Sequence, residues 1–201
     1  MKYYHKINSV FNRDMSKKGA PFIMGEWSRP EFEELNQCQW VGTEKVDGTN
    51  IAVHWDGFNV RFFGRSDKSA IPSPLLRRLE QIDGVQDLPI NAILYGEGFG
   101  GKIQKVGKLY GATDFVLFDV FINGVYLRRA DVDDIAAKIG VKSVPEAFSG
   151  TLTQALAVVE NGQRSAFGDL TSEGLILTPV GGFLNRQGHR IITKIKHKDF
   201  R

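Results

Sequence analysis

The chain has 201 residues, a formal net charge of +3 and 42% hydrophobic residues, a composition typical of soluble globular proteins and not of disordered or fibrous ones. We expect one domain over residues 1–201, because a chain of this length can bury a stable hydrophobic core without disulfides or structural metal ions. No apolar run approaches membrane-spanning length, and the first residues lack the apolar segment of a signal peptide. Cys38 is the only cysteine, which excludes an internal disulfide and a cysteine-cluster zinc site. These features favour a reducing, cytoplasmic setting, and they leave open whether the protein is cellular or phage-encoded.

The first quarter of the chain shows little periodicity. Residues 1–42 mix apolar residues with Gly, Pro and charges, and we expect an irregular covering segment with one short helix over Arg29–Asn36. The octapeptide TEKVDGTN follows at 43–50. It predicts a short loop that carries Lys45 into a strand, with Gly48 allowing the backbone to pass close to a ligand.

A hairpin and a helix are predicted next. NIAVHW and FNVRFFG both alternate apolar and polar residues, and Asp56-Gly57 between them is a strong two-residue turn signal. Ser73-Pro74 then opens a helix, in which apolar residues recur at Leu75, Leu79 and Ile82.

The remaining elements are a strand over Ala92–Tyr95, a hairpin, two helices and two final strands. The hairpin joins Asp114–Ile122 to Val125–Arg129 through Asn123-Gly124. The signals for helix ends and strand alternation give the other ranges: helices Ala130–Ile139 and Leu152–Glu160, the latter capped by Thr151, and strands Gly174–Thr178 and Arg190–His197.

Strands outnumber helices and come mainly as hairpins, which predicts an α+β fold with antiparallel sheets. The segment GEGFGG at 96–101 contains the glycine spacing of a dinucleotide fingerprint. That motif requires a helix directly after it, and GKIQKVGKLYG is poor helix material, so we reject a Rossmann site. The candidate functional residue in this segment is Glu97, an acid at the end of a strand. The alternative is that Glu97 is only a solvated carboxylate.

Lys45 is the first candidate for chemistry. A lysine on such a loop can be a nucleophile, a phosphate clamp or a surface cation, and the KxDG pattern alone is weak support. To attack phosphorus it must first lose its proton. Neighbouring cations, or a divalent metal, would favour that loss.

Two further segments supply such neighbours. Glu173-Gly174 leads into an apolar strand, and TKIKHK places Lys194 and Lys196 two residues apart, on one face of a strand. An exposed basic edge is the alternative for these lysines. The isoleucines around them favour a packed strand whose two lysines line a cleft. Glu97 and Glu173 could then hold Mg²⁺, directly or through its waters.

Six segments in this order resemble the covalent nucleotidyltransferases, a superfamily of ATP-dependent DNA ligases, RNA ligases and mRNA capping enzymes. The residues in these segments are most similar to those of the RNA ligase 2-like family of nick-sealing RNA ligases. The segments extend from about residue 40 to the end of the chain: EKVDGTN (Lys45), FGRS (Arg65), YGEGFGGKIQK (Glu97) with Tyr110 after it, DFVLFDVF (Phe118), SEGLIL (Glu173) and TKIKHK (Lys194, Lys196).

The resemblance implies a nucleotidyltransferase (ATP-grasp-like ligase) fold of two packed antiparallel sheets with flanking helices. It also implies an ATP-dependent RNA ligase for RNA repair, with ATP as AMP donor and Mg²⁺ or Mn²⁺ as cofactor. Lys45 would form lysyl-AMP, pass AMP to an RNA 5′-phosphate, and the enzyme would then seal that end to a 3′-OH.

The resemblance also implies roles for the other residues. Arg65, Glu97, Glu173, Lys194 and Lys196 would be catalytic, with Glu97 and Glu173 serving the metal. The implied nucleotide-binding residues are Thr43 and Glu44 beside adenine, Val46, Asp47 and Asn50 around the nucleophile loop and ribose, and Phe118 stacked on adenine.

The candidates for RNA contact are Lys and Arg residues that are expected to be exposed. Each of them could equally be a solvated loop residue with no role in RNA binding. The candidates are Lys102, Lys105, Lys108, Arg128, Arg129 and Arg186. The chain ends seven residues after Lys194. We therefore expect no C-terminal domain of the kind usual in such ligases: the chain would be a minimal ligase, an excised catalytic domain, or a chain needing a partner protein to engage RNA. We also expect a monomer. The alternatives are a DNA ligase, a capping-type transferase, or a nucleic-acid-binding module without catalysis.

Overall fold

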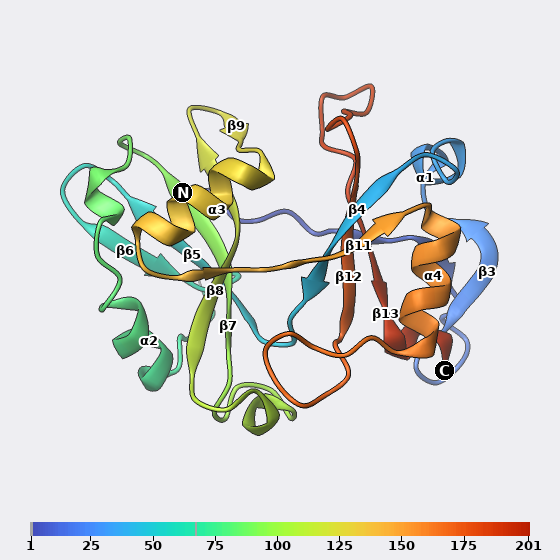
Figure 1. Cartoon of the computed structure of the whole chain (residues 1–201), viewed down its shortest axis with the longest axis horizontal. Helices are drawn as coiled ribbons and strands as arrows, with labels where there is room; N and C mark the ends of the chain where they lie inside the picture. The colour runs from blue at the N-terminus through green and yellow to red at the C-terminus, as the bar shows by residue number, and fades with distance from the viewer. Residues whose placement is uncertain (1, 67) are drawn as a thin grey trace. The chain divides into compact units, whose positions relative to one another are not determined.

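The computed structural model describes residues 2–66 and 68–201. The chain folds into two compact units, each built around its own sheet. Unit 1 contains the segment ending at His5 together with Asp47–Val144, and unit 2 contains Lys6–Val46 and Pro145–Arg201. Mainly antiparallel sheets with few helices make up both units (Figure 1), so the predicted α+β class is confirmed. The expectation of one domain stays a prediction.

Unit 1 is organised around a six-stranded sheet. The order is β10-β8-β7-β5-β6, with β9 added beside β8, and every pair is antiparallel except β10 with β8. The strands are β5 (Thr49–Trp55), β6 (Val60–Phe63), β7 (Ile93–Phe99), β8 (Asp114–Ile122), β9 (Val125–Tyr126) and β10 (Lys142–Ser143). The helices are α2 (Ser73–Leu79) and α3 (Arg129–Lys138), with short 3₁₀ turns at Val85–Asp87 and Gly107–Tyr110.

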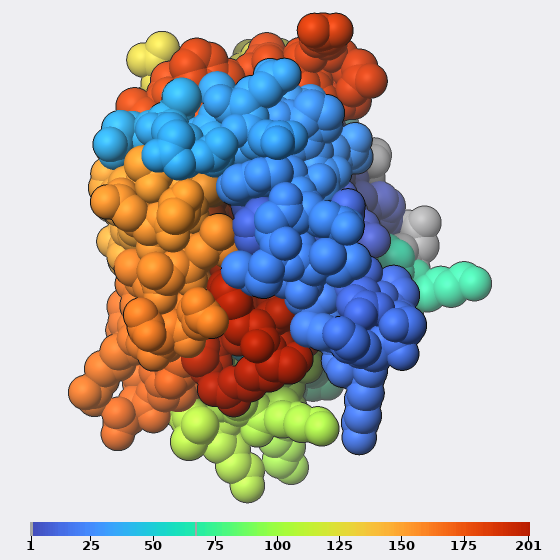
Figure 2. All heavy atoms as spheres, turned by 90° about the vertical axis from the view of Figure 1, so that its right-hand side faces the viewer, coloured from blue at the N-terminus to red at the C-terminus, as the bar shows by residue number. Residues whose placement is uncertain are grey.

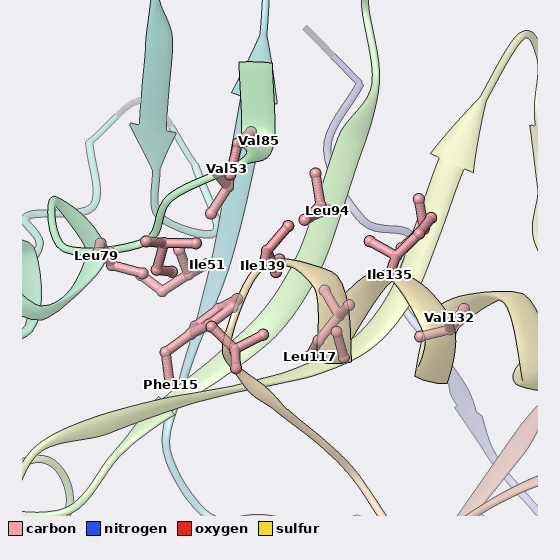
Figure 3. Packing of buried hydrophobic residues seen from close by; sticks show 14 of the residues in the cluster. Ile51, Val53, Leu79, Val85, Leu94, Phe115, Leu117, Val132, Ile135 and Ile139 are labelled. Atoms are coloured by element: carbon pink, nitrogen blue, oxygen red, sulfur yellow. The ribbon is translucent and has the colours of Figure 1, made fainter. Parts of the chain in front are cut away.

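The core of unit 1 lies between this sheet and its two helices. Leu75 and Leu79 of α2 are fully buried, and so are Leu94 and Leu117 of the sheet. Figure 3 shows these strands meeting Val132, Ile135 and Ile139 of the α3 segment. Burying each such side chain contributes roughly 1.5–3 kcal/mol, so this packing fixes the sheet on which the later residues stand.

The predicted elements of unit 1 are present with three differences. The hairpin loop spans four residues instead of two, because Trp55 pairs with Val60 and the Asp56 carboxylate accepts the backbone N–H groups of Phe58 and Asn59. The predicted strand Val125–Arg129 ends at Tyr126, and Arg129 begins α3.

The third difference is that the strand predicted over Ala92–Tyr95 continues through the glycine-rich segment. Glu97 therefore lies inside β7, opposite Asn50 of β5 and Val116 of β8, and not at a strand end. No α-helix follows directly, as the rejection of a dinucleotide site required, since only a 3₁₀ turn occurs at Gly107–Tyr110.

Unit 2 contains a five-stranded sheet and a two-stranded ribbon. The sheet order is β1-β13-β12-β4-β11, antiparallel except for β1 with β13, and the ribbon pairs β2 with β3. The strands are β1 (Asn8–Ser9), β2 (Phe11–Arg13), β3 (Phe22–Trp27), β4 (Trp40–Lys45), β11 (Glu146–Gly150), β12 (Gly174–Pro179) and β13 (Thr193–Lys196). The helices are α1 (Pro30–Glu34), α4 (Leu152–Asn161) and the 3₁₀ turn His197–Phe200.

One face of this sheet is covered by α4. The helix begins at a capping box, in which the Thr151 hydroxyl accepts the N–H of Gln154 and the Gln154 side chain accepts the N–H of Thr151. Its apolar residues join the fully buried Leu175, Leu177 and Ile195 of the sheet. Figure 2 shows α4 in orange on one side of the dark red C-terminal residues, with the blue β2–β3 segment on the other.

Several predictions for unit 2 were wrong in detail. Residues 1–42 are not irregular, since β1, β2 and β3 form there, and Lys45 ends strand β4 instead of lying on a loop. The last strand begins at Thr193, not Arg190. The short helix α1, the Thr151-capped helix and β12 are confirmed. Among the described residues, no helix combines the length and the apolar character needed to cross a membrane.

Candidate active site

The predicted catalytic residues of unit 2 gather on the sheet face that α4 does not cover. In the register of the three central strands, Gly174 of β12 stands between Lys45 of β4 and Lys196 of β13. Two residues further along, Ile176 stands between Thr43 and Lys194. Because side chains alternate along a strand, both rows face the same side, while Leu175 and Ile195 point into the core.

Glu173 joins the two lysines of the first row. Its Oε2 lies 2.5 Å from Lys45 Nζ, and its Oε1 lies 2.6 Å from Lys196 Nζ. All three side chains are largely withdrawn from solvent, with 21%, 18% and 13% of Lys45, Lys196 and Glu173 exposed. Two ammonium groups thus converge on one carboxylate, each holding one oxygen.

This geometry changes the acidity of the carboxylate. Burial raises the pKa of Glu173. The positive charge of Lys45 and the hydrogen bonds from Lys196 and Lys45 lower it by more than burial raises it, so the pKa lies below the usual value for Glu. Glu173 is therefore an anion at neutral pH. It can orient both amines but is a weak proton acceptor.

Gly174 makes the first row possible. Its φ is +150°, and a Cβ placed there would lie 1.9 Å from the Ile195 carbonyl oxygen and 2.8 Å from Lys196 Cα. Only a glycine therefore lets β12 and β13 approach this closely.

Thr43 and Lys194 form the second row with Ile176, and both are half-buried. The remaining predicted neighbours of Lys45 alternate in direction. Glu44, 4% exposed, points to the other face of β4, where its carboxylate accepts the Ser165 hydroxyl (2.5 Å) and the Ala166 N–H (2.8 Å). The structure therefore does not bring the Glu44 carboxylate together with the lysines.

The rest of the KVDG segment crosses from Val46, which is buried in unit 2, to Asp47 and Gly48 of unit 1. Within unit 1, the Asp47 N–H donates to the Tyr110 hydroxyl (3.2 Å), and the Gln104 side chain donates to the Gly48 carbonyl (2.8 Å). A Cβ on Gly48 would lie 2.2 Å from the Gly98 carbonyl. The close approach that this glycine allows is thus to strand β7.

The predicted nucleotide-binding residues of unit 1 share one face of its sheet. Asn50 pairs with Glu97 across β5 and β7, on the face opposite the α2–α3 core. Phe118 packs against the aromatic cluster on that same face, where its ring lies 5.0 Å from the ring of Tyr4. It is the extra residue of a bulge in β8, because Tyr95 pairs with Asp119 and Gly96 with Leu117.

The predicted cations of unit 1 are mostly exposed. Arg65 lies on the exposed segment after β6, and Lys102, Lys105, Lys108 and Arg128 are exposed. Arg129 instead forms an ion pair with Asp133 and donates to the Phe118 carbonyl at 3.4 Å.

The protein groups offer little for a metal ion by themselves. Among the described residues, no three His, Cys, Asp or Glu side chains cluster as a metal site. Both Glu173 oxygens are also held by lysines. This carboxylate does not fit direct ligation in the present arrangement. A Mg²⁺ held chiefly by nucleotide phosphates and water is compatible with it, because Mg²⁺ commonly binds proteins in that way.

Comparison with known proteins identifies the family. The model of the RNA ligase family matches residues 38–196, which include both strands that carry the lysines and the whole of unit 1 from Asp47 onward. The chain belongs to the RNA ligase family. No curated protein sequence matches it.

Solved structures of this RNA ligase family share the fold. A lysine-to-alanine mutant of Naegleria gruberi RNA ligase with ATP and Mn matches with a TM-score of 0.65 and 25% identity, over 85% of this chain and 54% of that one. A lysine-to-methionine mutant with AMP and Mn matches with a TM-score of 0.65 and 24% identity, over 83% and 52%. The chain thus spans about half the length of these structures.

Sequence reasoning missed the partners of the residues that flank Lys45 in the chain. Ser165 holds Glu44, and Tyr110 and Gln104 hold the Asp47–Gly48 segment. These contacts join residues more than 50 positions apart, and no local pattern signals them. Tyr110 had one available signal, its place after GEGFGGKIQK, but that did not indicate its partner.

Proposed function

We propose that this chain is the adenylyltransferase domain of an ATP-dependent RNA ligase, with Lys45 as the residue that carries AMP. One observation supports this above all: Lys45 and Lys196, from strands distant in sequence, both contact the buried carboxylate of Glu173. A lysine that serves only as a surface cation does not require a buried carboxylate partner. A lysine nucleophile must be held in one orientation toward its target atom, and such a partner can hold it.

In the first step the Lys45 amine, after losing a proton, attacks the α-phosphorus of ATP. A P–N bond forms, the bond from that phosphorus to the bridging oxygen breaks, and pyrophosphate leaves. Glu173 aims Lys45 before the attack. Lys196 and Lys194, two residues apart on β13, then offset negative charge on the phosphates. A divalent cation would add charge neutralisation on the triphosphate when bound.

The later steps use the same phosphorus and then RNA. An oxygen of an RNA 5′-phosphate attacks lysyl-AMP, the P–N bond breaks, and AMP is joined to the RNA end. A 3′-OH then attacks the RNA 5′-phosphorus, the new phosphodiester forms and AMP leaves. We propose, from the family resemblance, that Arg65, Glu97 and Phe118 contact the nucleotide, and that ATP and Mg²⁺ or Mn²⁺ are the cofactors.

The decisive experiment is covalent labelling with [α-³²P]ATP and Mg²⁺, followed by intact mass measurement and peptide mapping. Wild-type protein should gain one adenylyl group on the peptide that contains Lys45, and added pyrophosphate should remove it. Lys45→Ala, Glu173→Ala and Lys194→Ala should not be labelled. The matched control is Lys138→Ala, since Lys138 also forms an ion pair, with Asp134, but is 70% exposed.

Each alternative predicts a different pattern. A binding module without catalysis gives no label in any variant, and label that persists in Lys45→Ala refutes the assignment of the nucleophile. A capping-type transferase prefers GTP to ATP, and a DNA ligase seals DNA nicks in preference to RNA.

A further inference from the structure

The segment between β12 and β13, residues 180–190, has properties that the ligase chemistry does not explain. Figure 1 shows it as an orange-red loop extending beyond the end of β12. Three large apolar side chains are exposed on it: Val180 by 53%, Phe183 by 48% and Leu184 by 58%. Exposure of one apolar residue is ordinary, but three within five positions on one loop indicate a contact surface.

This loop is held in shape by its own bonds. The backbone of Asn185 donates to His189 (2.8 Å) and accepts from Gly188 (2.9 Å), and its side chain accepts the N–H of Gln187 and of His189. Leu184 pairs with Arg190 as an antiparallel bridge, and Ile191 donates to the Phe183 carbonyl (3.0 Å). The segment is thus a preformed hairpin tip, which loses little conformational entropy on binding.

The charge around the hairpin selects the partner. From Gly174 to Lys198 the sequence contains five Lys and Arg and no Asp or Glu. Arg186 is exposed at the tip, three residues after Phe183. An exposed aromatic ring beside an exposed cation suits a nucleic-acid strand, whose bases stack on the ring and whose phosphates meet the cation.

We propose that residues 180–190 form a single-stranded RNA contact, in which Phe183 stacks on a base and Arg186 binds a phosphate. This proposal rests on the proposed function, because it takes RNA as the substrate. The hairpin starts at the end of β12 away from Glu173. The six residues of that strand span about 20 Å, or roughly six nucleotides of a stacked strand.

The hairpin contact should therefore depend on RNA length. A 5′-phosphorylated RNA of 20 nucleotides can occupy both Lys45 and the hairpin, while one of four nucleotides bound at Lys45 cannot reach the hairpin. We expect Phe183→Ala to weaken binding of the 20-mer about 5- to 150-fold, from the loss of one stacked base, and to leave binding of the four-nucleotide RNA unchanged. Arg186→Ala should reduce the salt dependence of 20-mer binding by about 0.7 in log–log slope.

The measurement is fluorescence anisotropy with 3′-labelled RNA, without ATP, at several salt concentrations. Phe58→Ala is the matched control, because Phe58 is 90% exposed at another hairpin tip, beside the acid Asp56. It should bind both RNAs like wild type. Phe183→Tyr keeps a ring and should keep the affinity, so a comparison with Phe183→Leu carries the test if Phe183→Ala does not fold.

Two results would overturn the proposal. One is equal affinity of wild type, Phe183→Ala and Arg186→Ala for the 20-mer. The other is binding of the hairpin to vesicles of phosphatidylserine and phosphatidylcholine in place of RNA, since apolar and basic residues also suit an anionic membrane. Labelling of Lys45 needs no RNA, so failure of the hairpin proposal and failure of the ligase proposal are separate outcomes.

Discussion

Replacing Gly174 by alanine tests whether the close contact of β12 and β13 creates the lysine–carboxylate arrangement. The new Cβ would lie 1.9 Å from the Ile195 carbonyl, so the strands must separate by roughly 1 Å. The backbone at φ +150° adds about 1–3 kcal/mol of strain, and overpacking adds about 1–3 kcal/mol. We expect the free energy of unfolding to fall by about 3–5 kcal/mol and the melting temperature by at least about 6 °C.

The effect on chemistry should exceed that of lost stability. A displacement of about 1 Å can cost on the order of 100-fold in rate, so labelling of Lys45 by ATP should slow at least about tenfold well below the melting temperature. Gly25→Ala is the control, because Gly25 has φ +84° in the same unit and no atom within 4 Å of its Cβ position. The reasoning is wrong if Gly174→Ala melts and labels like Gly25→Ala.

Three further predictions concern stability. The pKa of Glu173 is lower in the folded than in the unfolded protein, so the ionised carboxylate stabilises the fold fully above about pH 4.3, and this contribution is lost as pH falls through the folded pKa. The variant Glu173→Gln lacks this titration. In acid titrations followed by circular dichroism, its free energy of unfolding should therefore fall less than that of the wild type over this pH range. Asp199→Asn removes the buried partner of Arg13, 2.6 Å away, and should cost about 3 kcal/mol in urea unfolding; adding Arg13→Met should recover part of this, and additive losses would contradict the pairing. Thr151→Ala should lower the unfolding free energy by about 1 kcal/mol, because it removes the capping box of α4, and no change would mean that the cap contributes nothing.

Local signals in the sequence were enough to predict much of the fold. Asn123 and Gly124 both adopt positive φ, as the turn at this dipeptide requires, and Thr151 caps α4 as expected. The apolar periodicity of Leu75 and Leu79 also gave α2 correctly. These features depend on neighbours within a few residues, which is why a sequence can reveal them.

The missed features depend on distant partners. The sequence predicts a loop at the end of β4, because the strands that pair with β4 there, β11 and β12, lie more than 100 positions away. The bulge at Phe118 was hidden in the apolar run DFVLFDVFI, which is covered on both faces and so shows no alternation. The candidate residues Lys45, Glu173 and Lys196 could be named from the resemblance, but the shared carboxylate required the register of three strands.

The pairing of β1 with β13 has a consequence for biosynthesis. All of unit 1 has been synthesised once Val144 has emerged from the ribosome, whereas unit 2 combines Lys6–Val46 with Pro145–Arg201. Such distant pairings close slowly, since a long loop must be ordered first. We therefore expect the nascent chain to acquire a folded middle first, and to place Lys45 beside β12 and β13 only after β13 has emerged.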